Sequence, residues 1–299
     1  MALTLWAPAK VNLFLEVLGK RADGYHEVRT ILQHVDVCDE IRIMEGGEGI
    51  SVESQGLPSP QGAENLAYRA AALFLESCGI RTGVQIQITK NIPPGSGMGG
   101  GSSDAATTLW GLNHLLQADV APERLRLLGA RLGSDVPFFF DGPTAWASGR
   151  GEDLHPLPPF PVSWLLIVFP GFPVSTTWAY TNLQLTDDDK SIRVRTAAEN
   201  GDYESLLASS WNRFEEIVFR RYPVVRQLKE YLEACGARPA LMTGSGSAVF
   251  GRARSREDAE GWAGRLREKG YAVFVVRTLS HPPLDPGGIG QMGPERSSC

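Results

Sequence analysis

The sequence PPGSGMGGGSSDAA, residues 93–106, is a glycine-rich loop that leads directly into a helical pattern. Glycine permits positive φ and a close approach of the backbone to a ligand, and the free N–H groups at a helix start attract anions. Ser102, Ser103 and Asp104 are plausible cap residues of that helix. We therefore predict a phosphate-binding loop made of Pro93, Pro94, Gly95, Ser96, Gly97, Met98, Gly99, Gly100, Gly101, Ser102 and Ser103.

Three other interpretations of the loop fit its context less well. A flexible linker is unusual between an alternating strand, here residues 84–89, and an amphipathic helix. A dinucleotide fold needs its glycine turn directly after a strand, whereas Pro93 and Pro94 intervene. A Walker loop needs a Lys before its Ser or Thr, and Gly101 stands there. Any cation for the phosphates must come from elsewhere in the chain or from a metal.

Composition limits the class of protein. A chain of 299 residues that is 42% hydrophobic can bury one large domain or two. Its 29 basic and 34 acidic residues give a net charge of -5, which favours small-molecule partners over nucleic acid. The four cysteines are scattered without metal spacing, and no apolar stretch is long enough for a membrane span. A reducing cytoplasm is the simplest compartment, and the chain could be a monomer or a homodimer.

The hydrophobic pattern predicts a strand-rich first third and an alternation of strands and helices later on. The predicted strands are residues 3–6, 11–17, 28–35, 40–44, 84–89, 164–169, 240–242, 248–251 and 272–277. The predicted helices are residues 64–78, the helix after the loop, and residues 122–132, 203–218, 222–235 and 256–269. A proline cluster at 156–161 predicts domains at residues 1–157 and 158–282, and the Gly, Pro and Ser content of residues 283–299 predicts a disordered tail.

Three further segments carry candidate functional residues, each with a plainer interpretation. Lys10 and Asn12 alternate onto one face of a strand, which could be a polar site or a solvated surface. Asp135 precedes an apolar run, so it could be functional or could cap a helix. The segment Thr-Gly-Ser-Gly-Ser, residues 243–247, could close over a site or be a simple glycine turn.

Together and in this order, the three segments and the loop resemble the GHMP kinases, named for galactokinase, homoserine, mevalonate and phosphomevalonate kinases. The resemblance covers residues 3–277. It implies an α+β, two-domain fold. The N-terminal domain would bind ATP and have a fold that resembles a domain of a ribosomal protein, and the C-terminal domain would be ferredoxin-like. Residues 7–13 and Asp-Gly-Tyr-His at 23–26 resemble the branch that phosphorylates the 2-hydroxyl of 4-diphosphocytidyl-2-C-methyl-D-erythritol in the non-mevalonate isoprenoid pathway.

The resemblance also implies how the phosphoryl transfer is catalysed. Asp135 would be the base that accepts the proton of the substrate hydroxyl, and Lys10 would stabilise charge on that oxygen and on the γ-phosphate of ATP. Mg²⁺ would bridge the β- and γ-phosphate oxygens, with the hydroxyl of Ser102 or Ser103 as its protein ligand. These roles agree with the chemistry of phosphoryl transfer, which needs positioning of the reactants and neutralisation of charge more than covalent catalysis.

The same resemblance assigns the residues that recognise the substrates. Tyr25 and His26 match the cytidine-binding pair of this branch, and Tyr180 matches a second stacking aromatic. An ordinary hairpin histidine is the plainer interpretation of His26. The remaining assignments are Asn12, Thr243 and Gly244 at the substrate, and Asn65 and Lys90 near the adenine.

Two other functions remain as alternatives. The first is another small-molecule kinase of the superfamily, acting on homoserine, mevalonate or a sugar, and Asp-Gly-Tyr-His speaks against it. The second is a nucleic-acid-binding module, because the predicted N-terminal fold is shared with a ribosomal protein. Fold does not imply function, and the acidic balance is unfavourable for that role.

Overall fold

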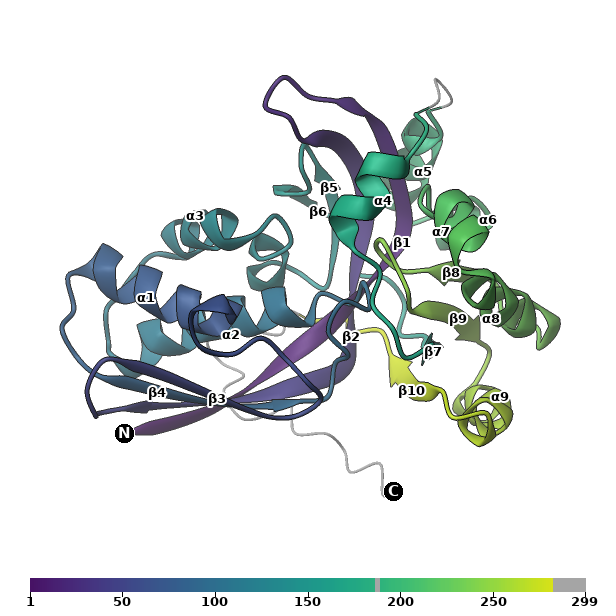
Figure 1. Cartoon of the computed structure of the whole chain (residues 1–299). Helices are drawn as coiled ribbons and strands as arrows, with labels where there is room; N and C mark the ends of the chain where they lie inside the picture. Colours follow the sequence, from purple (N-terminus) through teal and green to yellow (C-terminus); the bar gives the residue numbers. More distant parts are fainter. Residues whose placement is uncertain (186–188, 282–299) are drawn as a thin grey trace.

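The computed structural model describes residues 1–185 and 189–281, which form two β-sheets with helices packed on them (Figure 1). The first sheet has the order β3-β4-β2-β5-β6, with β1 paired to β2. Its strands are β1 (Ala2–Lys20), β2 (His26–Glu45), β3 (Ile50–Gly56), β4 (Val84–Lys90), β5 (Thr144–Ser148) and β6 (Asp153–Pro156). The helices of this half are α1 (Leu66–Cys78), α2 (Gly100–Leu115) and α3 (Pro122–Leu132), with the 3₁₀ turns η1 (Gly62–Glu64) and η2 (Pro137–Phe140).

The second sheet is antiparallel with the order β10-β7-β9-β8. Its strands are β7 (Trp164–Phe169), β8 (Ala240–Met242), β9 (Val249–Ala253) and β10 (Ala272–Arg277). Helices α4 (Thr176–Asn182), α5 (Ser191–Glu199), α6 (Tyr203–Ala208), α7 (Glu215–Arg221) and α8 (Pro223–Ala234) lie between β7 and β8, and α9 (Arg256–Glu268) lies between β9 and β10. This strand order and the placement of the helices are those of a ferredoxin-like domain, as predicted.

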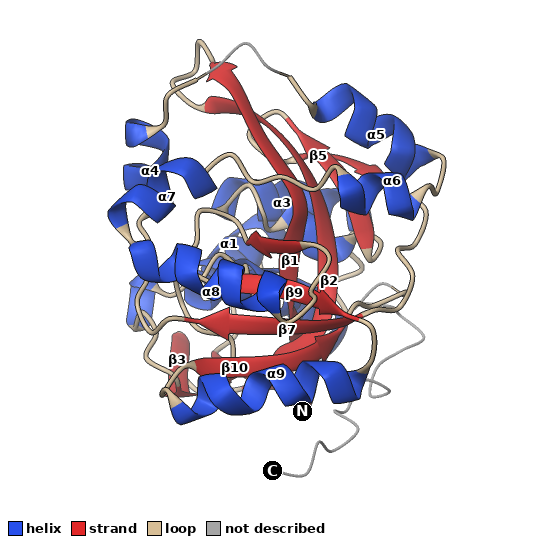
Figure 2. Ribbon diagram, turned by 90° about the vertical axis from the view of Figure 1, so that its right-hand side faces the viewer, coloured by secondary structure: helices blue, strands red, loops and turns tan. Residues whose placement is uncertain are grey.

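The second sheet lies between helices and the long strands of the first half. Leu166 and Val168 of β7 pack with residues of α8 and α9, whose position over the sheet is visible in Figure 2. Leu165 and Ile167, the alternating residues, pack with residues of β1 and β2 instead. One apolar core therefore crosses the proposed domain boundary at residue 157. That boundary stays a prediction, and the predicted tail, residues 283–299, lies outside the described residues.

Strands β1 and β2 correct the prediction of four separate strands in this part of the chain. Each is a single long strand, and the two form an antiparallel pair with register shifts at Pro8/Ala9, Asn12/Phe14 and Val17/Gly19. Pro8 has no N–H to donate, and the irregularity beside it lets the strand continue. The long pair extends from the first sheet toward the second half, as Figure 1 shows, and carries Lys10 and His26 to the same part of the molecule as Tyr180.

The predicted helix at residues 203–218 is also wrong, because residues 209–214 interrupt it between α6 and α7. Here the chain bonds to β1 through Leu15 N–H to Trp211 O (2.7 Å) and Arg213 N–H to Leu15 O (2.9 Å). The side-chain amide of Asn212 donates to Met242 O (2.6 Å) and Gly244 O (2.9 Å). Tertiary hydrogen bonds outweigh the helical preference of this segment.

Several local predictions are confirmed. Helix α1 ends before Gly79, as predicted, with φ 65 at that glycine; it begins at Leu66, two residues later than predicted, after Asn65, whose side chain accepts from Ala67 N (2.9 Å). Val84, Ile86 and Ile88 of β4 are buried, while Gln85 and Gln87 between them are exposed. Helix α3 starts with Pro122 at its first position, where a missing N–H costs nothing.

His34 of β2 is a buried histidine on the same side of the sheet as Lys10, because the two residues are directly opposite in the β1–β2 register. Its ring packs against Phe138 (4.1 Å between centroids) and Phe139 (5.2 Å), and neither ring nitrogen has a hydrogen-bond partner in the described residues. Burial lowers the pKa of His34 to about 3, so the imidazole is neutral in the folded protein.

We expect His34 to make the protein sensitive to acid. Below pH 6.5 the unfolded chain binds a proton at His34 that the folded state excludes, so stability falls as the pH decreases toward 3. Between pH 7 and pH 5 this single group should cost about 2 kcal/mol. Urea unfolding at both pH values should show that the free energy of unfolding falls by about 2 kcal/mol more in the wild-type protein than in His34→Leu. Equal losses in the two proteins would contradict a neutral, buried His34.

Candidate active site

The glycine-rich loop connects β4 to α2 and is held between two other segments. Gly97, with φ 85, lies against residues 243–246: a Cβ there would lie 2.1 Å from Thr243 O. Gly99, with φ 73, lies against Lys10, and a Cβ there would lie 3.0 Å from the Cγ of Lys10. Positive φ and close contact both require glycine at these two positions. The loop is thus fixed in space by β1 on one side and by the β8–β9 turn on the other.

Helix α2 starts at Gly100, so Ser102, Ser103 and Asp104 lie within its first turns and do not cap it. Gly99 is the N-cap, in the left-handed conformation, and it makes no side-chain cap bond. The N–H groups of the first turn are therefore left for a ligand. Ser102 is half-buried, whereas Ser103 is fully buried and its hydroxyl has no partner in the described residues.

Lys10 and Asp135, which are far apart in the sequence, meet beside this loop. The Nζ of Lys10 lies 3.5 Å from Oδ2 of Asp135 and donates to Oδ1 of Asn12 (2.8 Å). The backbone N–H of Lys10 donates to Met98 O (2.9 Å), which attaches β1 to the loop. The side chain of Lys10 is 4% exposed, whereas that of Asp135, in the turn after α3, is 38% exposed. A buried cation thus stands behind a carboxylate that a ligand can reach.

Asp135 does not cap the 3₁₀ turn that follows it. The N-cap position of η2 is Val136, and no side chain makes a cap bond there. The capping interpretation of Asp135 is therefore wrong, and the carboxylate is left to Lys10 and to solvent.

Asn12 joins the two halves of the protein beneath the site. Its Oδ1 accepts from Lys10 Nζ (2.8 Å), from Thr243 Oγ1 (3.1 Å) and from Gly244 N (2.9 Å). Its Nδ2 donates to Oγ1 of Thr30 (2.8 Å), and its side chain is buried. The side chains of Asn12 and Thr243 are thus occupied by protein contacts, which orient Lys10.

The three aromatic candidates lie near one another but not in one stack. The rings of His26 and Tyr180 are stacked with centroids 4.9 Å apart, and Tyr180 packs edge-on against Phe214. Tyr25 is exposed and lies under the guanidinium of Arg150, 4.9 Å from its ring centroid. Burial and the nearby charge of Asp135 raise the pKa of Tyr180 well above its usual range, so its hydroxyl stays protonated. Burial and, to a lesser degree, Lys20 lower the pKa of His26, which favours the neutral imidazole at pH 7.

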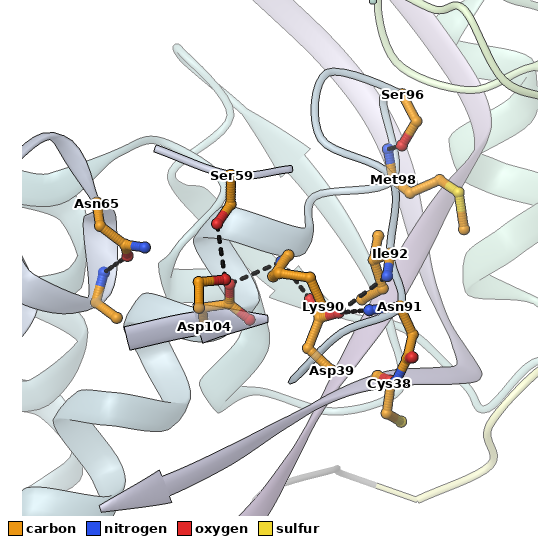
Figure 3. A network of polar contacts seen from close by, with 12 residues as sticks. Cys38, Asp39, Ser59, Asn65, Lys90, Asn91, Ile92, Ser96, Met98 and Asp104 are labelled. Carbon is orange, nitrogen blue, oxygen red and sulfur yellow. Dashed lines mark hydrogen bonds and ion pairs between the residues drawn. The ribbon is translucent and has the colours of Figure 1, made fainter. Parts of the chain in front are cut away.

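Asn65 and Lys90 have clear structural partners. The side chain of Asn65 caps α1 and donates to Pro60 O (3.0 Å). The ammonium of Lys90 bonds to Oδ2 of Asp39 and to Oδ2 of Asp104 (2.8 Å), all three side chains being buried (Figure 3). Sequence reasoning did not find Asp39, because a single Asp in an alternating strand has no pattern of its own.

The described residues contain no cluster of three or more His, Cys, Asp or Glu side chains that could hold a metal ion. Within the same residues, no helix is both long and apolar enough to cross a membrane.

Comparison with known proteins identifies the family. Residues 65–143 match the GHMP kinases N terminal domain, and residues 190–272 match the GHMP kinases C terminal domain. The 4-diphosphocytidyl-2-C-methyl-D-erythritol kinase of Geobacter metallireducens is 46% identical over 281 residues, which cover 93% of this chain and 99% of that protein. That of Moorella thermoacetica is 45% identical over 286 residues, with the same coverage of both chains.

Solved structures agree with this assignment. A crystal structure of 4-(cytidine 5'-diphospho)-2C-methyl-D-erythritol kinase superposes with a TM-score of 0.79 at 37% identity, covering 92% of this chain and 99% of that chain. Homoserine kinase from Cytophaga hutchinsonii, at 20% identity and a TM-score of 0.72, shares the fold. The chain therefore belongs to the GHMP kinases and, within them, to the 4-diphosphocytidyl-2-C-methyl-D-erythritol kinase family.

Proposed function

We propose that this protein transfers the γ-phosphoryl group of ATP to the 2-hydroxyl of 4-diphosphocytidyl-2-C-methyl-D-erythritol, a step of the non-mevalonate isoprenoid pathway. The observation that carries the proposal is the pairing of Lys10 and Asp135 (3.5 Å) beside the glycine-rich loop. It supplies a base, a cation and an anion-binding backbone in one place, which are the parts that phosphoryl transfer requires. The family membership supports the same reaction.

ATP binds with its phosphates at residues 93–103, where the N–H groups of the loop and of the first turn of α2 face the anion. Gly97 and Gly99 hold the loop against Thr243 and Lys10, so a bound γ-phosphate lies near the ammonium of Lys10. Lys10 thereby replaces the lysine that a Walker loop would carry within its own sequence.

Asp135 accepts the proton of the 2-hydroxyl as its oxygen attacks phosphorus, and the bond between phosphorus and the β–γ bridging oxygen of ATP breaks. The 38% exposure of the Asp135 side chain gives the substrate access to this carboxylate. The ammonium of Lys10 stabilises the negative charge that develops on the attacking oxygen. Asn12 keeps Lys10 in position through its 2.8 Å hydrogen bond.

The donor set near the loop fits Mg²⁺ as a partner of ATP. Mg²⁺ prefers oxygen ligands and is commonly held by substrate phosphates, waters and one or two protein groups. The half-buried hydroxyl of Ser102 suits this role better than that of Ser103, which is fully buried. When bound, the ion neutralises charge on the β- and γ-phosphates.

The cytosine ring of the acceptor is recognised by Tyr25, His26 and Tyr180. Tyr25 offers an exposed ring face, and Tyr180 is stacked on His26 with the charge of Asp135 in its surroundings. A neutral His26 can donate one hydrogen bond and accept another at the edge of the base. The proposal requires the 2-hydroxyl at the other end of the acceptor to reach Asp135.

A substrate panel tests the reaction. Purified protein with Mg²⁺ and ATP should release ADP with 4-diphosphocytidyl-2-C-methyl-D-erythritol, and at least 10²-fold more slowly with homoserine, mevalonate or galactose, which lack the cytidyl group. Phosphorus NMR of the product should show a new phosphomonoester on the 2-oxygen. Faster turnover of another panel member would replace the proposed acceptor, and RNA binding without ATP turnover would remove the kinase assignment.

A further inference from the structure

The glycine-rich loop is closed at its base by three buried side chains from three different elements (Figure 3). Asp39 comes from β2, Lys90 is the last residue of β4, and Asp104 lies in the second turn of α2. The loop leaves the sheet directly after Lys90 and enters the helix just before Asp104, so its two ends are joined through the Lys90 ammonium.

Asp39 also holds the first residues of the loop by their backbone. Its Oδ1 accepts from the N–H of Asn91 (2.6 Å) and of Ile92 (2.9 Å), while its Oδ2 accepts from Lys90. These are the residues at which β4 leaves its pairing with β2, where backbone N–H groups lose their strand partners. A fully buried carboxylate that accepts from three consecutive residues fixes the direction in which the loop departs.

Lys90 lies directly behind the start of α2. A Cβ placed on Gly100, the first residue of that helix, would lie 3.2 Å from the Nζ of Lys90. Burial acts to lower the pKa of Lys90, but the two carboxylates outweigh it and raise that pKa, so the ammonium remains charged. The Lys90 ammonium thus lies next to the first N–H groups of α2 and is held there by the two carboxylates.

Asp104 makes fewer hydrogen bonds than Asp39. Its Oδ2 accepts from Lys90 (2.8 Å), and its Oδ1 has no hydrogen-bond partner in the described residues. Burial raises the pKa of Asp104, and the charge of Lys90 opposes that shift.

We propose that Asp39, acting through Lys90 and the backbone of Asn91 and Ile92, is a positioning residue that sets the affinity of the loop for the phosphates of ATP. This inference rests on the proposed use of ATP at the loop. Asp39 is too deeply buried to touch a ligand itself. Its loss should therefore weaken ATP binding selectively, because the acceptor is recognised by Tyr25, His26 and Tyr180 on other segments.

Asp39→Asn is the test variant, and Asp36→Asn is its matched control. Asp36 lies on the same strand and also accepts from a backbone N–H and a guanidinium, those of Arg277 (2.8 Å from N and 3.2 Å from Nε). Arg277 belongs to β10, which is outside the loop. Asp39→Asn should raise the KM for ATP and the Kd for ADP about tenfold, and leave the KM for the acceptor within twofold. Asp36→Asn should lower the melting temperature and leave both KM values unchanged.

The ADP titration of the wild-type protein comes first: if it shows no binding, the proposed function itself is wrong and the inference falls with it. If the wild type binds ADP and a folded Asp39→Asn binds it equally well, the inference alone is overturned. An equal rise of both KM values overturns it as well, because a general loss of structure would have that effect. If Asp39→Asn does not fold, Asp104→Asn replaces it as the test variant. We expect a smaller but still selective rise of its KM for ATP. An unchanged KM for ATP would overturn the proposal.

Discussion

Replacement of Asp135 by Asn should lower kcat about 10³-fold while the KM values for ATP and acceptor change little. Asparagine has the shape of aspartate but cannot accept the proton of the attacking hydroxyl. Because the Asp135 side chain is 38% exposed and makes no cap bond, the substitution removes little that the fold depends on. Steady-state ADP release and a thermal melt of the same sample would measure both effects.

Asp141→Asn is the matched control for this experiment. Asp141 lies six residues further on and pairs with Nε of Arg126 (2.8 Å), and its carboxylate is 12% exposed. Its replacement should reduce stability and leave kcat within twofold. A kcat in Asp135→Asn that stays within tenfold of the wild type would show that the proton leaves the hydroxyl by another route.

Replacement of Lys10 by Met should lower kcat by about 10²–10³-fold, the size of effect seen when one charged donor to a developing oxyanion is removed. Methionine occupies the space of the buried aliphatic part of the Lys10 side chain but carries no charge. Asn12 Oδ1 keeps two other donors, Thr243 and Gly244, so the junction between the two halves should persist. Single-turnover rates at saturating ATP would separate this effect from any change in binding.

The double variant of Lys10→Met and Asp135→Asn sharpens this prediction. Both groups act on the same hydroxyl oxygen, and they lie 3.5 Å apart, so their effects should not multiply. We expect the double variant to be slower than the slower single variant by less than tenfold. A full product of the two single losses would mean that Lys10 and Asp135 act at separate places.

Local chemistry in the sequence was sufficient for much of the fold. Gly79 marks the end of α1, and the alternation of Val84, Ile86 and Ile88 marks β4, because a glycine stop and periodicity depend on neighbours along the chain. The glycines of the loop were readable for the same reason. Where contacts with distant segments competed, local prediction was wrong, as at residues 209–214, which pair with β1.

The site needed more than local chemistry. The residues of the pair Lys10 and Asp135 are individually ambiguous, and the cap interpretation of Asp135 and of Ser102 fails only when the helix starts are known. Asn12 and Thr243 were predicted at the substrate, and that role stays a prediction; the structure shows that their side chains bond to each other and join the two halves. Asp39 was not singled out, because nothing near it in the sequence shows that it meets the end of β4.

By itself, the sequence determined an α+β fold and the family resemblance and predicted a phosphate loop, because glycine spacing, hydrophobic periodicity and ordered motifs are local properties of the chain. Only the tertiary structure decided which charges meet at the loop: Lys10 with Asp135 in front, and Lys90 with Asp39 and Asp104 behind. The physical reason is that electrostatic interaction depends on distance in space, and the long β1–β2 pair brings together residues that the sequence separates.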